Sequence, residues 1–174
     1  MYDYIDDLIS NLFEFVDDGL KSNDAILIIS TAEHREKLDE RLRLAGHNVF
    51  SLRLRDQYIC LDASEMLAEF MIHGSPDPLL FRYTIGDLVK RAKRSQRSVR
   101  AFGEMVAILW AAGNQEGALA LEGLWNTYMD IEPFTLFCAY PAKVVSGSEL
   151  FDEVRHAHRH CIVQSEKPLL YTSA

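Results

Sequence analysis

The sequence predicts an α/β fold in which a mainly parallel β-sheet is flanked by helices. Short, continuously apolar runs alternate with amphipathic stretches of ten or more residues, a pattern typical of buried parallel strands connected by helices. The chain has 174 residues, 48% of them hydrophobic, which is enough for one sizeable core. Because it contains no repeat, low-complexity tract or internal linker, we expect residues 1–174 to form a single domain.

The first elements are a helix and then a strand–helix unit. Residues 2–20 are expected to be helical, because apolar side chains recur there at intervals of three and four. Residues 25–30 form a short apolar run that predicts a strand buried on both faces. Ser30 stands three residues before Glu33, which is capping-box spacing, and the helix that follows is expected to end at a Gly46 cap.

The alternation of strands and helices continues along the chain. Three further strands are expected at residues 58–61, 98–102 and 134–140. Further helices are expected at residues 65–71, 78–94, 104–112, 114–129 and 149–156, with a loop at 73–78. Ligands of open parallel sheets bind outside the carboxyl ends of the strands. Side chains that follow each strand are therefore the candidates for a functional site.

Glu104 is the strongest of these candidates. It follows a buried strand and Gly103, so its carboxylate is placed to accept a ligand hydrogen bond or to hold a metal. The alternative is an acid that interacts only with the dipole of the helix it begins. Asp62 and Tyr140 end two other strands, and simple packing is the alternative for Tyr140.

Other candidates surround these strand ends. Thr31 and His34 follow the first strand, although we interpret His34 and Arg35 mainly as solvated side chains of a charged helix. Phe102, Met105 and Trp110 are expected to line an apolar wall. The complete candidate ligand-binding set is Thr31, His34, Asp62, Phe102, Glu104, Met105, Trp110 and Tyr140. We expect no catalytic residue, no metal ligand and no cofactor.

Three further features have structural interpretations. His156, His158, His160 and Cys161 cannot all share one face of a strand or a helix, so a solvated helix end is favoured over a metal site. The basic cluster at residues 90–100 fits a helix end and a solvated loop as well as it fits a phosphate or an acidic partner. Cys60, Cys138 and Cys161 form no C-x-x-C pair, which indicates free thiols in a reducing compartment.

Composition and missing motifs exclude several classes of protein. The net charge of -8 argues against a dedicated nucleic-acid binder. No apolar run approaches the roughly 20 residues of a membrane span, and the acidic start is unlike a signal peptide, so we expect a cytoplasmic protein without membrane contact. The motifs of P-loop, dinucleotide-binding and serine-hydrolase sites are absent. We therefore expect no enzyme activity.

Several segments together resemble the MEDS domain, the sensory domain shared by methanogen and methylotroph regulators, including the dichloromethane-responsive repressor. They are residues 19–35, 61–63, 100–105, 137–140 and 158–160, and the similarity covers roughly residues 10–165. The resemblance implies a three-layer RecA- and KaiC-like fold without the phosphate-binding loop. It also implies a role in sensing, with hydrocarbon-like small molecules as proposed ligands. Glu104, Tyr140, His34, His158 and His160 match motif positions of the family.

The sequence thus predicts a sensory domain of prokaryotic signal transduction. It is expected to bind a small ligand or a protein partner at the strand ends, and to act with a histidine kinase of a two-component system, with another regulatory module or as a homodimer. Two alternatives stay open at this point. One is a degenerate nucleotide-binding RecA-like protein, and the other is a pure interaction module that pairs through its acidic first helix or its basic cluster.

Overall fold

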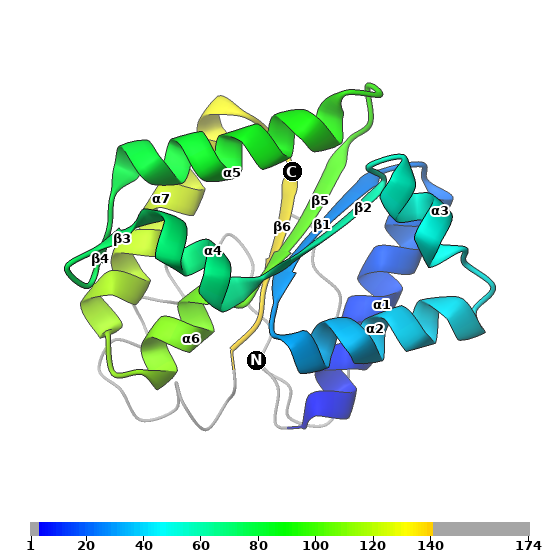
Figure 1. Cartoon of the computed structure of the whole chain (residues 1–174), viewed down its shortest axis with the longest axis horizontal. Coiled ribbons are helices and arrows are strands. Elements are labelled where there is room, and N and C mark those ends of the chain that lie inside the picture. The colour runs from blue at the N-terminus through cyan, green and yellow to red at the C-terminus, as the bar shows by residue number, and fades with distance from the viewer. Residues whose placement is uncertain (1–3, 141–174) are drawn as a thin grey trace.

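The computed structural model describes residues 4–140 and shows a layer of parallel strands between two layers of helices (Figure 1). The strands are β1 (Ala25–Ser30), β2 (Tyr58–Asp62), β3 (Met71–Ile72), β4 (Ser75–Pro76), β5 (Val99–Gly103) and β6 (Thr135–Cys138). The helices are α1 (Ile5–Lys21), α2 (Ala32–Leu44), α3 (Val49–Leu54), α4 (Ala63–Phe70), α5 (Pro78–Lys93), α6 (Met105–Ala111) and α7 (Gln115–Ile131). The predicted α/β class is confirmed.

The main sheet has four parallel strands in the order β2-β1-β5-β6. From β1 the chain first moves outward to β2 and then returns across β1 to form β5. The direction of winding therefore reverses between β1 and β5, which makes the gap between their carboxyl ends the topological switch point of the sheet. Ser30 pairs with Asp62, and Ile29 pairs with Gly103, so the strands end at a common edge.

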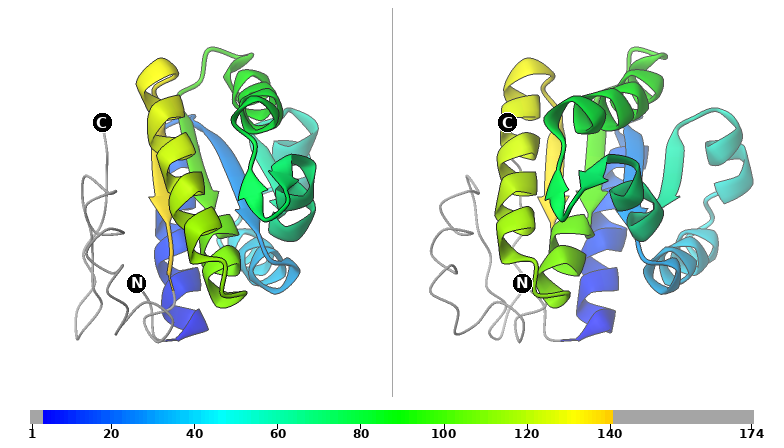
Figure 2. Two further views of the ribbon diagram at one scale, coloured as in Figure 1. Left: turned by 90° about the vertical axis from the view of Figure 1, so that its left-hand side faces the viewer. Right: turned by 60° about the vertical axis from the view of Figure 1, so that its left-hand side comes forward.

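The reversal also explains how the helices divide between the two faces. Crossover connections between parallel strands are right-handed, so connections that run in opposite directions along the sheet cover opposite faces. The connection from β1 to β2 places α2 and α3 on one face, where α1 joins them (Figures 1 and 2). The two later connections run in the other direction and place α4, α5, α6 and α7 on the second face.

Each face of the sheet has its own apolar core. Side chains alternate along a strand, so Ile26 and Ile28 of β1 enter one core while Leu27 and Ile29 enter the other. All six residues of β1 are buried. Burial from both sides explains why this strand is a continuous apolar run rather than an alternating one.

The predicted cap at the carboxyl end of α2 is confirmed, whereas the predicted cap at its amino end is wrong. Gly46 has a φ of 91°, and the amides of Gly46 and His47 donate to the carbonyls of Arg43 and Leu42, as in a Schellman motif. The predicted capping box at the other end is wrong. Ser30 stays in β1, where it is paired with Asp62, so Thr31 takes the N-cap position instead.

Two short elements were not expected from the sequence. α3 occupies residues 49–54 and begins where the Asn48 side chain accepts a hydrogen bond from the Ser51 amide. The β3–β4 hairpin begins at Met71, where a helix was expected, and continues into the expected loop at 73–78; its turn residues His73 and Gly74 both have positive φ. The helix expected at 149–156 lies outside the described residues. Within residues 4–140, no helix combines the length and the apolar character needed to cross a bilayer.

Candidate functional site

Glu104 lies directly at the switch point between β1 and β5. Its backbone amide donates to the Ile29 carbonyl of β1 at 3.0 Å, which fixes the residue at the edge of the sheet. Glu104 is also the N-cap residue of α6, but its side chain makes no capping hydrogen bond to that helix. The carboxylate instead reaches across the switch point toward the first turn of α2.

Both carboxylate oxygens of Glu104 are bound by this turn. Oε2 accepts a hydrogen bond from the Thr31 amide at 2.9 Å, and Oε1 lies 2.5 Å from Nδ1 of His34. The imidazole can donate through Nδ1 to the carboxylate in its neutral and its protonated form. Only 3% of Glu104 and 7% of His34 are exposed. The interpretation of His34 as a solvated residue is therefore wrong, because this face of α2 packs against the sheet.

A second polar contact lies beside the first, on the β2 side. Arg35 donates through Nη2 to Oδ2 of Asp62 at 3.0 Å. The other oxygen of Asp62 caps α4 by accepting from the amides of Ser64 and Glu65. Arg35 is half-buried and ion-paired rather than freely solvated as the sequence suggested. Asp62 thus joins the start of α4 to the first turn of α2.

Tyr140 makes a separate buried contact. Its hydroxyl donates to Oε1 of Glu122, and both side chains are buried. Glu122 was not selected from the sequence. It lies on the same apolar stripe of α7 as Ala118, Leu121 and Trp125, and an acid on such a stripe is the signal that identifies it.

The expected apolar wall does not form as a single surface. Phe102 points into the core under α1–α3, where its ring centroid lies 5.3 Å from that of Phe137. Met105 and Trp110 are buried in the other core, on the opposite face of the sheet. The structure therefore brings Thr31, His34 and Glu104 together, places Asp62 beside them through Arg35, and separates Phe102 from the group.

This arrangement favours some chemistries over others. The amino end of a helix is a common binding site for phosphate, but the amide of Thr31 is here bound by an internal carboxylate. A bound phosphate would have to displace Glu104 or tolerate its negative charge. Within residues 4–140, no three His, Cys, Asp or Glu side chains are grouped closely enough to hold a metal ion.

Within the described residues, burial affects two of the thiols, and three cations of the basic cluster have acidic partners. Burial raises the pKa of the Cys60 thiol to about 11 and the pKa of Cys138 well above its ordinary value. Three cations of the basic cluster form ion pairs, namely Arg91 with Asp56, Lys93 with Glu132 and Arg100 with Asp24. The run His156–Cys161 lies outside the described residues.

Comparison with known proteins supports the resemblance seen in the sequence. A family model described as MEDS, "MEthanogen/methylotroph, DcmR Sensory domain", matches residues 1–159. The matched range includes every helix and strand described above. Neither the curated proteins nor the solved structures give a significant match.

Proposed function

Because the chain belongs to the MEDS family of sensory domains, we propose that it is a non-enzymatic sensor that recognises a small ligand or a protein partner beside Glu104. Membership of this family implies a role in signalling. The observation that supports the location is the buried contact of the Glu104 carboxylate with Thr31 and His34 at the switch point. This is the edge at which open α/β sheets bind their ligands.

The proposed mechanism is a shift between two positions of α2. Glu104 is bound to β1 through its backbone and to the first turn of α2 through its side chain. A group that competes for the carboxylate releases the Thr31 amide and the His34 ring from it. A ligand that binds better when α2 is released shifts the population toward that state. A differential affinity of about 1–3 kcal/mol is typical of such coupling.

The chemistry of the site suggests the class of ligand. A carboxylate attracts a hydrogen-bond donor or a cation, so a small molecule with a hydroxyl or an amino group suits Glu104. Met105, the next residue, belongs to an apolar core, so a ligand with a short hydrocarbon part beside its polar group suits this position. The response would be passed to a histidine kinase or to another regulatory module. Nucleotide binding is disfavoured by the carboxylate at the start of α2, and calorimetric titration with magnesium and ATP is expected to show no tight binding.

The experiment follows the Thr31 amide and the His34 ring by NMR while methanol, methylamine or dichloromethane is added. At least one of these compounds is expected to shift both signals and to raise the melting temperature. The shifts should be lost in Glu104→Gln and retained in the control Glu33→Gln, which changes an exposed carboxylate in the first turn of α2. If the shifts persist in Glu104→Gln, or if none of the three compounds alters either signal, the proposal fails for this class of ligand.

A further inference from the structure

Large apolar side chains extend into solvent where α2 ends and α3 begins. Leu44 is 81% exposed, and Phe50 and Leu54 are each 78% exposed. Phe50 and Leu54 are four residues apart and therefore lie on one side of α3. We call these three residues the α3 patch. Exposed apolar groups of this kind often mark an interaction surface.

Arginines flank the residues of the α3 patch in the sequence. Residues 41–55 contain four arginines and no acid. Arg43 and Arg53 both bind Oδ2 of the buried Asp39, at 3.2 and 2.7 Å, while their own side chains stay about half exposed. Arg41 and Arg55 also bond neighbouring side chains. Guanidinium groups that are already positioned lose little freedom on binding and suit the fixed carboxylates of a protein.

A complementary acidic surface lies on α1 of the same chain. Asp7, Glu14 and Asp18 are exposed and share one side of the helix, and Tyr4 is 73% exposed at its amino end. We call these four residues the α1 stripe. Among the described residues, no cation forms an ion pair with the three acids, whereas the neighbouring Asp17 pairs with Lys21 and His47.

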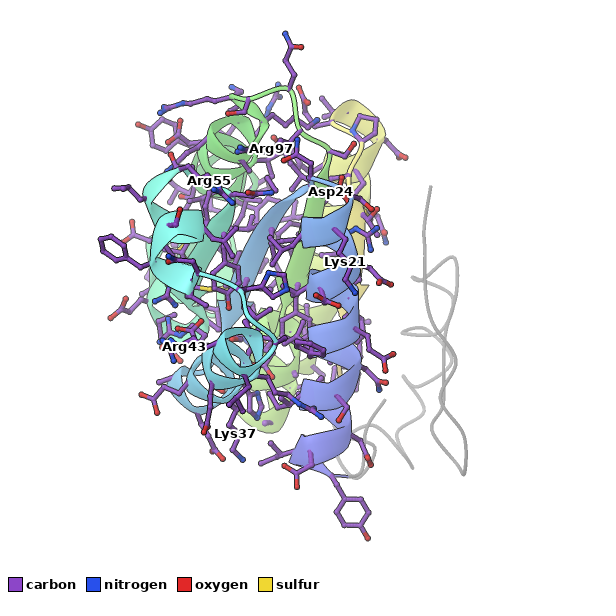
Figure 3. The ribbon with its side chains drawn as sticks, turned by 90° about the vertical axis from the view of Figure 1, so that its right-hand side faces the viewer. Lys21, Asp24, Lys37, Arg43, Arg55 and Arg97 are labelled. Atoms are coloured by element: carbon purple, nitrogen blue, oxygen red, sulfur yellow. The ribbon has the colours of Figure 1, made fainter. Side chains whose placement is uncertain are left out.

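We propose that the α1 stripe of one copy of this chain docks on the α3 patch of a second copy. The acids of the stripe face the arginines, and Tyr4 supplies an aromatic contact for Phe50 and Leu54. α1 and α3 lie on the same face of the sheet, α1 against β1 and β5 and α3 against β2 (Figure 3). The two surfaces differ, so the contact is head-to-tail, and in a pair one copy keeps a free patch and the other keeps a free stripe.

Electrostatics set the conditions for this contact. The net charge of -8 makes distant parts of two copies repel each other. At an ionic strength of 0.1 M, charges separated by more than about 10 Å are largely screened, so the local pairs dominate. Self-association is therefore expected in moderate salt and should weaken in about 1 M NaCl, where the local pairs are screened as well. The inference is independent of ligand binding at Glu104.

The experiment is sedimentation velocity of the full chain across a wide range of concentration in about 0.1 M NaCl. The wild type is expected to increase in mass with concentration. A patch variant, Phe50→Ser with Leu54→Ser, and a stripe variant, Glu14→Lys with Asp18→Lys, should each associate at least about tenfold more weakly. The control is Leu79→Ser with Tyr83→Ser, which removes an equally exposed pair from α5 and should leave association unchanged.

Mixing the two defective variants gives the decisive result. The patch variant keeps its stripe, and the stripe variant keeps its patch, so an equimolar mixture should form a one-to-one complex and nothing larger. Circular dichroism checks that each variant is folded. A wild type that is monomeric throughout, association that the stripe variant leaves intact, or a mixture that stays monomeric overturns the proposal. Binding to phosphatidylserine vesicles without self-association would also overturn it, because the patch would then belong to a membrane surface.

Discussion

Glu104 and His34 are 70 positions apart in the chain, yet Oε1 of Glu104 lies 2.5 Å from Nδ1 of His34 and both side chains are buried. The pairing of Ile29 with Gly103 makes this possible, because it aligns the ends of β1 and β5. The residues that follow each strand must then meet. The contact between Glu104 and His34 therefore occupies the switch point, at the carboxyl ends of β1 and β5.

Removing this carboxylate should destabilise the fold. Glu104→Ala leaves the Thr31 amide and the His34 ring without their acceptor, and we expect the free energy of unfolding to fall by about 3 kcal/mol. Glu104→Gln keeps one acceptor oxygen and should cost less, about 1–2 kcal/mol. Urea unfolding followed by the fluorescence of the buried Trp110 and Trp125 measures both changes. Equal losses for Ala and Gln would show that a single neutral acceptor oxygen gives no stabilisation at this position.

The buried position of His34 has a signal in the sequence. α2 is mostly charged, but its apolar stripe consists of Leu38 and Leu42, and His34 stands one further turn along the same line. Extending the stripe by four residues places His34 against the sheet. Treating the helix by its overall charge instead predicts a solvated histidine. The overall charge of α2 therefore gives the wrong prediction for His34, and the helical periodicity of its apolar residues gives the right one.

Other features depend on contacts that periodicity does not encode. β1 was predicted with its observed bounds because burial on both faces leaves a continuous apolar run. The order of the strands depends instead on pairings between distant segments, so the sequence located Glu104 at a strand end without identifying His34 as its partner. α3 and the β3–β4 hairpin are too short for a periodic pattern and are stabilised by local caps and turns.

Two buried tyrosines should respond differently to loss of their hydroxyl groups. The Tyr58 hydroxyl donates to Oδ1 of Asp39 at 3.0 Å, so Tyr58→Phe should reduce the free energy of unfolding by about 1–3 kcal/mol. Within the described part of the chain, the buried Tyr128 hydroxyl has no hydrogen-bond partner. Tyr128→Phe should therefore be neutral or stabilise by up to about 1 kcal/mol. Urea denaturation compares the two, and a similar loss in both would reveal an acceptor for Tyr128.

The thiol of Cys60 should react slowly in the folded protein. Burial raises its pKa to about 11, so about one thiol in a thousand is ionised at pH 8. Labelling with a disulfide reagent in a Cys161→Ser background should be slow, and the rate should rise about tenfold per pH unit from pH 8 to 10, because the thiolate is the reactive form. Urea should abolish the protection of both Cys60 and Cys138. Equally fast labelling of folded and unfolded protein would contradict this expectation.

Two helical glycines should have opposite effects when they are replaced by alanine. A Cβ at Gly19 of α1 would lie 2.6 Å from Cδ1 of Ile26 and 2.8 Å from Cδ of Arg100. Ile26 is fully buried, and Arg100 is held by Asp24 at 2.8 Å, so neither side chain moves without loss. Crowding of this kind costs about 1–3 kcal/mol.

At Gly123 of α7, by contrast, a Cβ would meet nothing within 4 Å. Alanine there should stabilise the protein by about 0.5–1 kcal/mol, because glycine loses more backbone freedom on folding. The same helical gain is available at Gly19, so the difference between the two variants isolates the close approach of α1 to β1 and β5. Urea midpoints measured side by side are expected to fall for Gly19→Ala and to rise for Gly123→Ala. If both midpoints rise, α1 can move away from the sheet at little cost, and the close packing at Gly19 does not position this helix.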